Sequence, residues 1–364
     1  MIKPKIAIVA GGTGGHFFPA KALAMQLKER HYPLLFITDK RIEDSHLAEW
    51  DNVQQFVVDS AGLAKKSLTH KVHNSFELIK GIFQSRKILN ENPVSVIIGF
   101  GGYPSIPPLF AAKLFQKKKR PIIILHEGNA IIGKANKLLI PIANAIATSF
   151  PKVKNLPKEK ITVKETGLPV RFEIENLYGS PYRLPTDKIN LLVWGGSLGA
   201  KIFNDIVPHA LTKLPNFIKQ KLSIVQQVRS EDIETVSNFY DRAQIQAQVL
   251  PFIDDVAYQL KRTHLIIGRA GGSSIAELSL IKRPAILIPY PFAANDEQYY
   301  NAMALQNMGA AWVIKQSQFT VSALTGLLDD LLEHPFKLHQ AANSNCLHYP
   351  KAAKKLADLI ESYI

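Results

Sequence analysis

A glycine-rich turn at residues 11–16 carries residue types that can bind an anionic ligand and act on it. Its sequence is Gly-Gly-Thr-Gly-Gly-His, and it lies between an apolar run at 5–10 and a helix-like stretch at 19–24. A strand, a glycine turn and a helix in this order present backbone N–H groups to a phosphate. Glycines let the backbone approach a ligand where a Cβ would clash. The turn is not the dinucleotide-binding fingerprint, because Phe17 stands where that pattern requires its third glycine.

Two side chains of this turn can do chemistry. Thr13 supplies a hydroxyl and His16 a titratable imidazole. A lone histidine in a loop is more often a structural cap, but the four surrounding glycines favour a functional role for His16. We therefore expect both binding and proton transfer at this turn.

The second half of the sequence places polar residues after successive strand-like runs, at 252–255, 268–277 and 289–298. The glycines and serines at 271–274 should begin a helix, whose N–H groups and dipole favour a diphosphate. Glu277 lies in the first turns of that helix, where a carboxylate can accept hydrogen bonds from ribose hydroxyls. Each feature alone is typical of ordinary loops, whereas all three at successive strand ends favour a nucleoside-diphosphate donor. The sequence has no Asp-x-Asp pattern, so we expect helix dipoles and cations such as Arg171, and no metal or cofactor, to meet the diphosphate charge.

Two other motifs match different enzyme classes incompletely. Residues 195–199 fit the Gly-x-Ser-x-Gly nucleophile elbow of α/β-hydrolases, followed by Asp254 or Asp255 and His264 in the right order. His264 directly precedes an apolar run, however, and a hydrolase leaves the first glycine turn unexplained. Residues 128–135 are one position short of a P-loop, because Ala135 lacks the hydroxyl that holds Mg²⁺. Both alternatives are disfavoured.

The composition predicts a soluble chain of two domains with an acidic partner. The chain has 364 residues, one cysteine and a formal charge of +14. A single cysteine excludes an intrachain disulfide. The basic charge favours a phosphorylated substrate or an anionic membrane surface, and the absence of zinc-finger, RNP-like or Arg-rich motifs disfavours nucleic acid. We expect neither a secretory signal nor a membrane span, because the apolar run at 6–10 and the stretch at 138–150 are too short or interrupted.

Strand-like runs alternate with helix-like segments along the whole chain. Many are almost continuously apolar, which is typical of strands buried on both faces of a parallel sheet. The expected strands are 5–10, 33–38, 53–58, 94–99, 121–126, 145–150 and 161–165, then 189–195, 222–228, 247–252, 264–268, 285–289 and 311–314. Since each half opens with a strand and a glycine turn, we predict two Rossmann-like domains facing a cleft. The predicted boundaries are 1–166, a hinge at 167–187, 188–345, and a C-terminal helix within 346–364 that could pack on either domain.

Taken together, these motifs resemble the MurG family of bacterial N-acetylglucosaminyltransferases. The resemblance covers most of the chain, most clearly 5–310, and seven motifs occur in order. They are 11–16 with Pro19, 99–103 (Gly-Phe-Gly-Gly-Tyr), 126–129 (His-Glu-Gly-Asn), 167–171 (Gly-Leu-Pro-Val-Arg), 195–200, 252–255 and the group 271–277 with Gln298. The sequence departs from the family pattern at Gly128, Leu168, Leu198 and Glu297. Of these, Leu168 affects the hydrogen bonding expected at the hinge.

The resemblance implies a GT-B fold and an inverting transfer of GlcNAc from UDP-GlcNAc to the C4 hydroxyl of lipid I, the undecaprenyl-diphosphate-linked muramoyl-pentapeptide. The product would be lipid II of peptidoglycan synthesis, made at the cytoplasmic face of the inner membrane by a peripheral enzyme. The implied donor-binding residues are Thr13, Gly14, Gly15, Asn129, Arg171, Ser197, Ile253, Gly272, Ser273, Ser274, Ile275, Ala276, Glu277 and Gln298, with Gly101, Gly102 and Tyr103 on the acceptor side. The alternatives are a related GT-B enzyme for another lipid and a non-catalytic nucleotide-sugar binding protein.

Two expectations concern mechanism and membrane contact. His16 is the first candidate for the base that takes the acceptor proton, and Glu127 is the second if burial raises its pKa. A helical stretch combines apolar residues with surrounding cations, which is typical of an interfacial helix. Its residues are Val72, Phe76, Ile79 and Phe83 with Lys71, Lys80, Arg86 and Lys87, and a further basic cluster lies at 117–120. An ordinary core helix with a solvated face has the same pattern.

Overall fold

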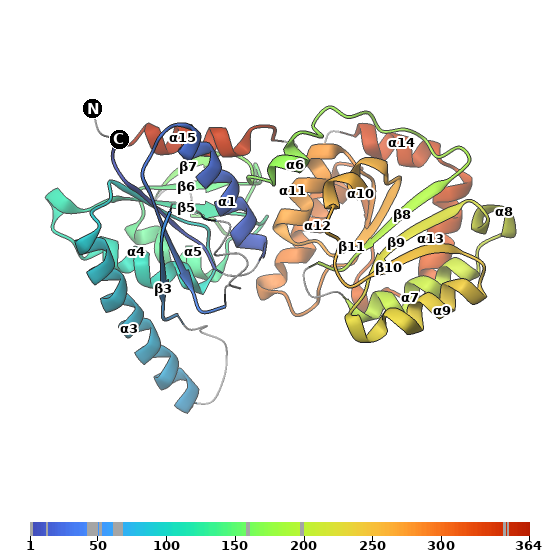
Figure 1. Ribbon diagram of the computed structural model, residues 1–364, viewed down its shortest axis with the longest axis horizontal. Coiled ribbons are helices and arrows are strands. Elements are labelled where there is room, and N and C mark those ends of the chain that lie inside the picture. Colours follow the sequence, from blue (N-terminus) through green and yellow to red (C-terminus); the bar gives the residue numbers. More distant parts are fainter. Residues whose placement is uncertain are drawn as a thin grey trace. The chain divides into compact units, whose positions relative to one another are not determined.

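The structure is a computed structural model that describes residues 3–11, 14–41, 50, 53–60, 68–157, 161–196, 200–344, 347 and 349–364. The chain forms two compact units, coloured along the sequence in Figure 1. The first comprises Met1–Phe172 and Lys351–Ile364, and the second comprises Glu173–Pro350. The C-terminal segment is therefore part of the unit that the N-terminus begins.

The first unit is built on a seven-stranded parallel sheet in the order β3-β2-β1-β4-β5-β6-β7. Its strands are β1 (Ile6–Val9), β2 (Leu34–Asp39), β3 (Gln54–Val58), β4 (Val96–Gly99), β5 (Ile122–Glu127), β6 (Ala145–Thr148) and β7 (Thr162–Glu165). Its helices are α1 (Gly14–Glu29), α3 (Leu68–Glu91), α4 (Ile106–Lys113), α5 (Lys134–Leu139) and α15 (Ala352–Glu361). The order reverses at β1, as in doubly wound nucleotide-binding sheets.

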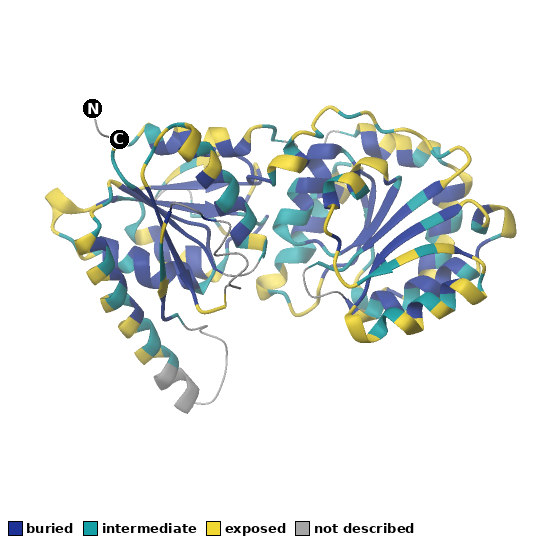
Figure 2. Cartoon of the chain, in the orientation of Figure 1, coloured by how far each residue is buried: buried dark blue, intermediate teal, exposed yellow. Residues whose placement is uncertain are grey.

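The central strands of this unit are apolar because both of their faces are covered. Every residue of β1, β2 and β4 is buried. Ile8 of β1 pairs with Phe36 of β2 on one side and with Ile98 of β4 on the other. Figure 2 shows these strands as a dark blue interior between more exposed helices. A continuous apolar run is thus explained by burial on two faces.

Helix α15 completes the core of the first unit by packing on α1. Leu356 and Ile360 are fully buried and join the cluster formed by β1 and α1. Arg30, which directly follows α1, makes ion pairs with Asp358 at 2.7 Å and with Glu361 at 2.6 Å. The last helix is therefore held by both apolar burial and ion pairs.

The second unit has a six-stranded parallel sheet in the order β10-β9-β8-β11-β12-β13. Its strands are β8 (Ile189–Trp194), β9 (Leu222–Gln227), β10 (Gln246–Leu250), β11 (Leu265–Gly268), β12 (Ala285–Leu287) and β13 (Ala311–Val313). Its helices are α7 (Lys201–Thr212), α8 (Asn216–Lys219), α9 (Ile233–Arg242), α10 (Val256–Arg262), α11 (Gly272–Ile281), α12 (Glu297–Asn307), α13 (Val321–Glu333) and α14 (Phe336–Asn343), and the short α6 (Phe172–Glu175) begins at the boundary between the units. Helices α7, α9 and α13 pack beside one another over the sheet core.

The predicted fold class of two Rossmann-like domains with parallel sheets is confirmed. Each predicted strand run contains a strand, and most bounds differ by one or two residues. The expected division at 167–187 compares with a division of the compact units after Phe172, and the second unit extends to Pro350. No helix in the described part of the chain is both long and apolar enough to cross a membrane.

Candidate functional site

In the first unit, the predicted residues lie at one edge of the sheet. Strand β1 ends at Val9, β4 at Gly99 and β5 at Glu127, and the three strands are parallel neighbours. The segments that follow these strands, beginning at residues 10, 100 and 128, therefore leave the sheet from the same edge. Carboxyl ends of parallel strands are where open α/β sheets bind ligands.

His16 lies at the start of α1 and faces the second glycine loop. A Cβ built on Gly102 would be 3.5 Å from Cε1 and 3.7 Å from Nε2 of His16. Gly101 and Gly102 have φ of 81° and 71°, so this close approach also needs a backbone conformation that glycine adopts without strain. The structure thus brings the first glycine turn and the predicted acceptor loop together, whereas Thr13 lies outside the described residues.

The environment of His16 keeps its imidazole neutral. Its pKa is lowered from 6.5 to about 4, mainly by burial and also by the charge of Arg41, while Asp39 acts in the opposite direction. Arg41 donates from Nε to Asp39 at 2.6 Å, so these two charges lie together beside the ring. A neutral imidazole retains a lone pair that can accept a proton at pH 7. This environment is compatible with the predicted role of His16 as a base.

Glu127 is buried and its carboxylate accepts four hydrogen bonds. Oε1 accepts from the backbone N–H and from Nδ2 of Asn129 at 3.0 and 3.3 Å. Oε2 accepts from the backbone N–H of Gly133 at 2.8 Å and from Nδ2 of Asn136 at 2.9 Å. Burial raises the pKa of this carboxyl, and the four donors oppose that rise.

These contacts give Glu127 an organising role in the loop that carries Asn129. To act as a base, the carboxylate would first have to give up N–H donors that hold the loop, so the geometry favours His16 as the base. The same contacts explain why 128–135 is not a phosphate-binding P-loop. The N–H of Gly133 points inward to Glu127 instead of outward to a ligand.

The segment at 167–171 is held against β5 and α1. Nε2 of His126 bonds to the carbonyl oxygen of Gly167 at 3.0 Å. The Arg171 guanidinium lies 5.1 Å from the centre of the Phe18 ring. Leu168 is buried and adjoins Gly128. A Cβ atom added to Gly128 would lie 3.5 Å from Cδ1 of Leu168. Two of the departures from the family pattern, Gly128 and Leu168, therefore pack against each other.

In the second unit, α11 begins directly after β11 and has its N-terminus at the carboxyl edge of the sheet. Its N-cap residue is Gly271, so no side chain of that residue accepts a hydrogen bond from the first N–H groups of the helix. Gly272, Ser273 and Ser274 form the partly exposed first turn. Backbone N–H groups in such a turn suit a phosphate. Ile275 and Glu277 of this helix are buried, Ala276 is half-buried, and Ile253 is buried in the loop before α10.

Gln298 is fixed by two neighbouring loops. Its Oε1 accepts from the backbone N–H of Ala270 at 3.2 Å and of Tyr290 at 3.0 Å. Both residues come directly after strands β11 and β12, so the amide is held at the carboxyl edge with its NH₂ group as the donor end. Asn295 and Asp296, which precede α12, have φ of 54° and 55°. Consecutive left-handed residues are strained and concentrate at functional sites.

Two observations bear on the hydrolase alternative. Ser197 lies outside the described residues. His264 precedes β11 at the amino edge of the sheet, and its Nδ1 accepts the backbone N–H of Asn190 at 2.9 Å. Gly195 and Gly196 follow β8 at the carboxyl edge, so His264 lies at the opposite edge of the sheet from the start of the 195–199 motif.

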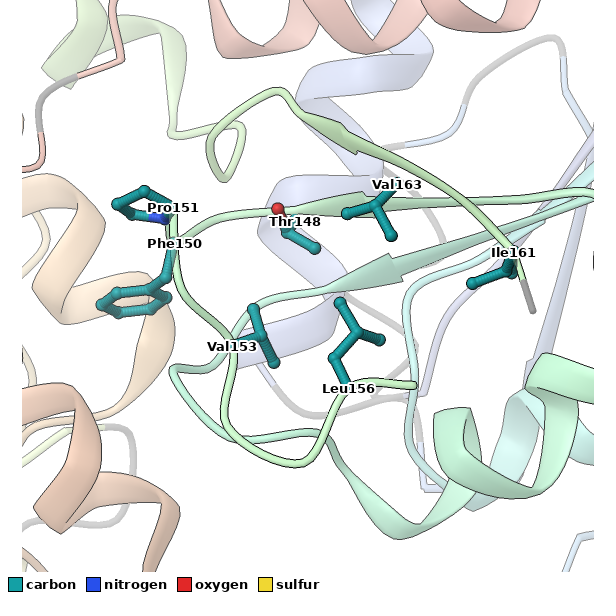
Figure 3. A pocket seen from close by; sticks show the side chains of 7 residues that line it. All are labelled: Thr148, Phe150, Pro151, Val153, Leu156, Ile161 and Val163. Atoms are coloured by element: carbon teal, nitrogen blue, oxygen red, sulfur yellow. The ribbon is translucent and has the colours of Figure 1, made fainter. Parts of the chain in front are cut away.

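The first unit also contains an apolar cavity of about 210 Å³ beside β6 and β7, where Val153, Leu156 and Val163 point inward (Figure 3). It contains none of the predicted site residues and is smaller than the roughly 300–1,000 Å³ typical of ligand sites. Among the described residues, no cluster of three His, Cys, Asp or Glu side chains could hold a metal ion.

Sequence reasoning missed several residues that build the site. Asn136 bridges Glu127 and the carbonyl of His126, and Phe18 supports Arg171. Their periodicity resembles that of ordinary helix residues, so no sequence signal distinguishes them. The Asn295-Asp296 pair did carry a signal, because Asn and Asp tolerate the left-handed conformation better than other non-glycine residues.

Comparison with known proteins identifies the family. The glycosyltransferase family 28 N-terminal domain matches residues 6–148, and its C-terminal domain matches residues 190–363. A relative from Gluconobacter oxydans, named UDP-N-acetylglucosamine–N-acetylmuramyl-(pentapeptide) pyrophosphoryl-undecaprenol N-acetylglucosamine transferase, is 49% identical over 98% of each chain. A Paramagnetospirillum magneticum protein of the same name is 42% identical over 100% of this chain and 97% of its own.

The structure agrees with this match. The crystal structure of Acinetobacter baumannii MurG superposes with a TM-score of 0.77 at 27% identity, covering 99% of this chain and 100% of that one. The fold and the matched domains define a GT-B glycosyltransferase of family 28. The chain belongs to the MurG family, which confirms the resemblance found in the sequence.

Proposed function

We propose that this protein transfers GlcNAc from UDP-GlcNAc to the C4 hydroxyl of lipid I, giving lipid II in peptidoglycan synthesis. The observation that carries the proposal is the 49% identity over 98% of the chain to a relative named for this transfer. The arrangement of both carboxyl edges supports it. A helix start whose N–H groups suit an anion and an oriented amide lie in the second unit, and a neutral histidine facing the Gly101–Gly102 loop lies in the first.

The residues of the second unit would hold the donor. The N–H groups at 272–274 would bind the diphosphate, Glu277 the ribose, the backbone of Ile253 the uracil, and the Gln298 amide the GlcNAc hydroxyls. Ser197 and Arg171 would contact the diphosphate side. Asn129, oriented by Glu127, would bind a further GlcNAc hydroxyl.

The residues of the first unit would activate the acceptor. His16 takes the C4 hydroxyl proton as that oxygen attacks the anomeric carbon of GlcNAc. The bond from the anomeric carbon to the diphosphate oxygen breaks at the same time, and UDP leaves with its electron pair. Attack from the side opposite to UDP inverts the anomeric configuration. The helix N-terminus stabilises the charge that develops on the leaving diphosphate.

The deciding experiment is transfer of labelled GlcNAc from UDP-GlcNAc to a lipid I analogue in EDTA, with UDP-glucose and UDP-GalNAc as alternative donors. GlcNAc-selective product without added metal is the expected result. Tight UDP-GlcNAc binding without transfer to this acceptor would retain the donor site and discard the assigned acceptor.

We further propose that the enzyme works at an anionic membrane surface, on the cytoplasmic face of the inner membrane. Phe76, Ile79 and Phe83 on α3 are 64%, 53% and 69% exposed and recur at helical spacing. Exposed Leu114 and the basic cluster at 117–120 add an apolar anchor and four cations. Exposed aromatic residues flanked by cations suit an interface with anionic lipid.

Two of the cations predicted to face the membrane, Lys80 and Arg86, have partners within the first unit. Two other predicted side chains of α3 are not described. Lys80 pairs with buried Asp59 at 2.8 Å, so it fastens α3 to the unit. Arg86 donates to the carbonyl oxygen of Leu114 and lies over the Phe115 ring, which joins α3 to the basic cluster. The side chains of Lys71 and Val72 lie outside the described residues.

A sedimentation assay tests the membrane proposal. Binding to vesicles with anionic lipid should exceed binding to neutral vesicles, and replacing Phe76 and Phe83 with Ser should reduce it. Replacing Lys117, Lys118 and Lys119 with Gln should remove about 1 kcal/mol per cation near the surface. Equal binding of the parent protein to anionic and neutral vesicles would contradict the proposal.

A further inference from the structure

Helix α12 holds the residue that leads into the proposed diphosphate site. Ala270 lies between β11 and α11 and is fully buried. Its N–H donates to Oε1 of Gln298 at 3.2 Å, and its carbonyl oxygen accepts from Nδ2 of Asn301 at 3.1 Å. Both backbone polar groups of Ala270 are therefore bonded to side chains of one helix.

Asn301 has no exposed surface, whereas Gln298, three residues earlier, is half-buried at the carboxyl edge of the sheet. Residues three apart lie on the same face of a helix, and α12 packs beside α11 (Figure 1). Since Asn301 cannot contact a ligand, an effect of Asn301 on donor binding must pass through a neighbour. Ala270 is the neighbour that joins it to α11.

The start of α11 is left without a side-chain cap, although its geometry would accept one. The N-cap residue Gly271 has φ of −62°, which any residue adopts without strain. A Cβ added there would meet no atom of the other described residues within 4 Å, its chain neighbours apart. An Asp, Asn or Ser at this position would usually bond to the first N–H groups of the helix. The glycine therefore leaves the N–H groups at 272–274 for an anion.

Free N–H groups stabilise an anion best when they already point at it, because no reorganisation is then needed on binding. Gly271 has no side chain to fix this direction, so the segments on either side of it must do so. On the helix side, the N–H of Ile275 donates to the carbonyl oxygen of Gly271 at 3.0 Å. On the strand side, the two bonds from α12 fix Ala270.

We propose that Asn301 is a positioning residue for the donor, which aims the N–H groups at 272–274 by holding the carbonyl group of Ala270. This inference rests on the proposed function, because it takes these N–H groups to bind the diphosphate of UDP-GlcNAc. Through Ala270, one helix sets both the start of α11 and the Gln298 amide that would hold GlcNAc. Diphosphate binding and sugar recognition therefore share one support.

The test compares the affinities of UDP and of uridine, which lacks the diphosphate, by calorimetric titration with uridine in competition. Asn301→Leu removes the donor at nearly unchanged side-chain size, and Asn301→Ala gives the same comparison if the leucine variant does not fold. The UDP affinity of these variants should fall about tenfold, the effect of one lost hydrogen bond to a charged group, while the uridine affinity stays unchanged.

Leu305→Ala is the control for lost stability, because Leu305 is also buried on α12. It should lower the free energy of unfolding but change neither affinity. Equal loss of UDP and uridine affinity in the Asn301 variants, or the same loss of UDP affinity in Leu305→Ala, would overturn the inference.

A variant at the helix start separates failure of this inference from failure of the proposed function. In Gly271→Asp, the new carboxylate should cap the N–H groups of α11 and repel a diphosphate, so UDP binding should be lost without a loss of stability. UDP binding that survives in Gly271→Asp would contradict the donor site of the proposed function. UDP binding that is lost in Gly271→Asp but kept in the Asn301 variants would overturn the role of Asn301 alone.

Discussion

At the scale of single residues, the site separates two groups that have the same predicted role. His16 and Glu127 are both candidates for the base, but the imidazole is neutral beside a glycine loop, whereas the carboxylate is enclosed by four N–H donors. Their variants should therefore fail in different ways.

His16→Ala should lower kcat by about 10²- to 10⁴-fold, the usual contribution of a positioned base, with little change in UDP-GlcNAc affinity. Glu127→Gln should mainly raise KM for UDP-GlcNAc, because the new amide cannot accept from all four donors and Asn129 loses its orientation. Steady-state kinetics with a separate donor-binding titration distinguish the two. Near-normal kcat in His16→Ala would exclude it as the base.

Two histidines with lowered pKa values, His16 and His126, predict how stability depends on pH. Burial lowers the pKa of both His16 and His126 to about 4 from 6.5, and Nδ1 of His126 has no partner among the described residues. The unfolded chain therefore binds more protons than the native chain between these values. Their contribution is fully present above pH 6.5 and is lost as pH falls towards 4, by up to roughly 3 kcal/mol for each histidine.

Urea unfolding from pH 7.5 to 4.5 measures this dependence. A His126→Asn variant should be less stable at pH 7.5 but should have a shallower decrease towards pH 4.5. An unchanged slope in the variant would contradict the predicted burial of a neutral ring.

At the scale of elements, the last helix is a part of the first unit. Ile360 of α15 is fully buried, so Ile360→Ala should cost about 2–5 kcal/mol in the free energy of unfolding. Arg30→Ala removes ion pairs whose partners Asp358 and Glu361 are 54% and 34% exposed, so its charge effect should be at most about 1 kcal/mol. Urea denaturation of both variants gives the comparison. A larger loss for Arg30→Ala would mean that the ion pairs, and not apolar burial, hold α15.

At the scale of the whole molecule, the two units have separate cores, and UDP should protect them unequally. If α11 holds the diphosphate, UDP at about 100 times its Kd should stabilise the second unit by about 2.7 kcal/mol. Hydrogen exchange of the full chain with and without UDP measures this, with protection expected at 268–298 more than in β1 or β2. Protection confined to the first unit would contradict the assigned donor site.

The sequence by itself determined the parallel sheets, because strands buried on two faces must be almost continuously apolar, as β1 and β12 are. It also determined where ligands should bind, since glycine turns and polar residues after strands reach the same edge. Only the tertiary structure decided that α15 packs on α1, because an amphipathic helix fits either unit equally well. Only the tertiary structure, again, decided that His16 faces Gly102 and that Asn136 reaches Glu127. The first contact joins segments about ninety residues apart, and the second is made to a buried carboxylate. The pKa of His16 and the orientation of the Glu127 loop depend on how far these groups are buried, which residue types and spacing do not encode.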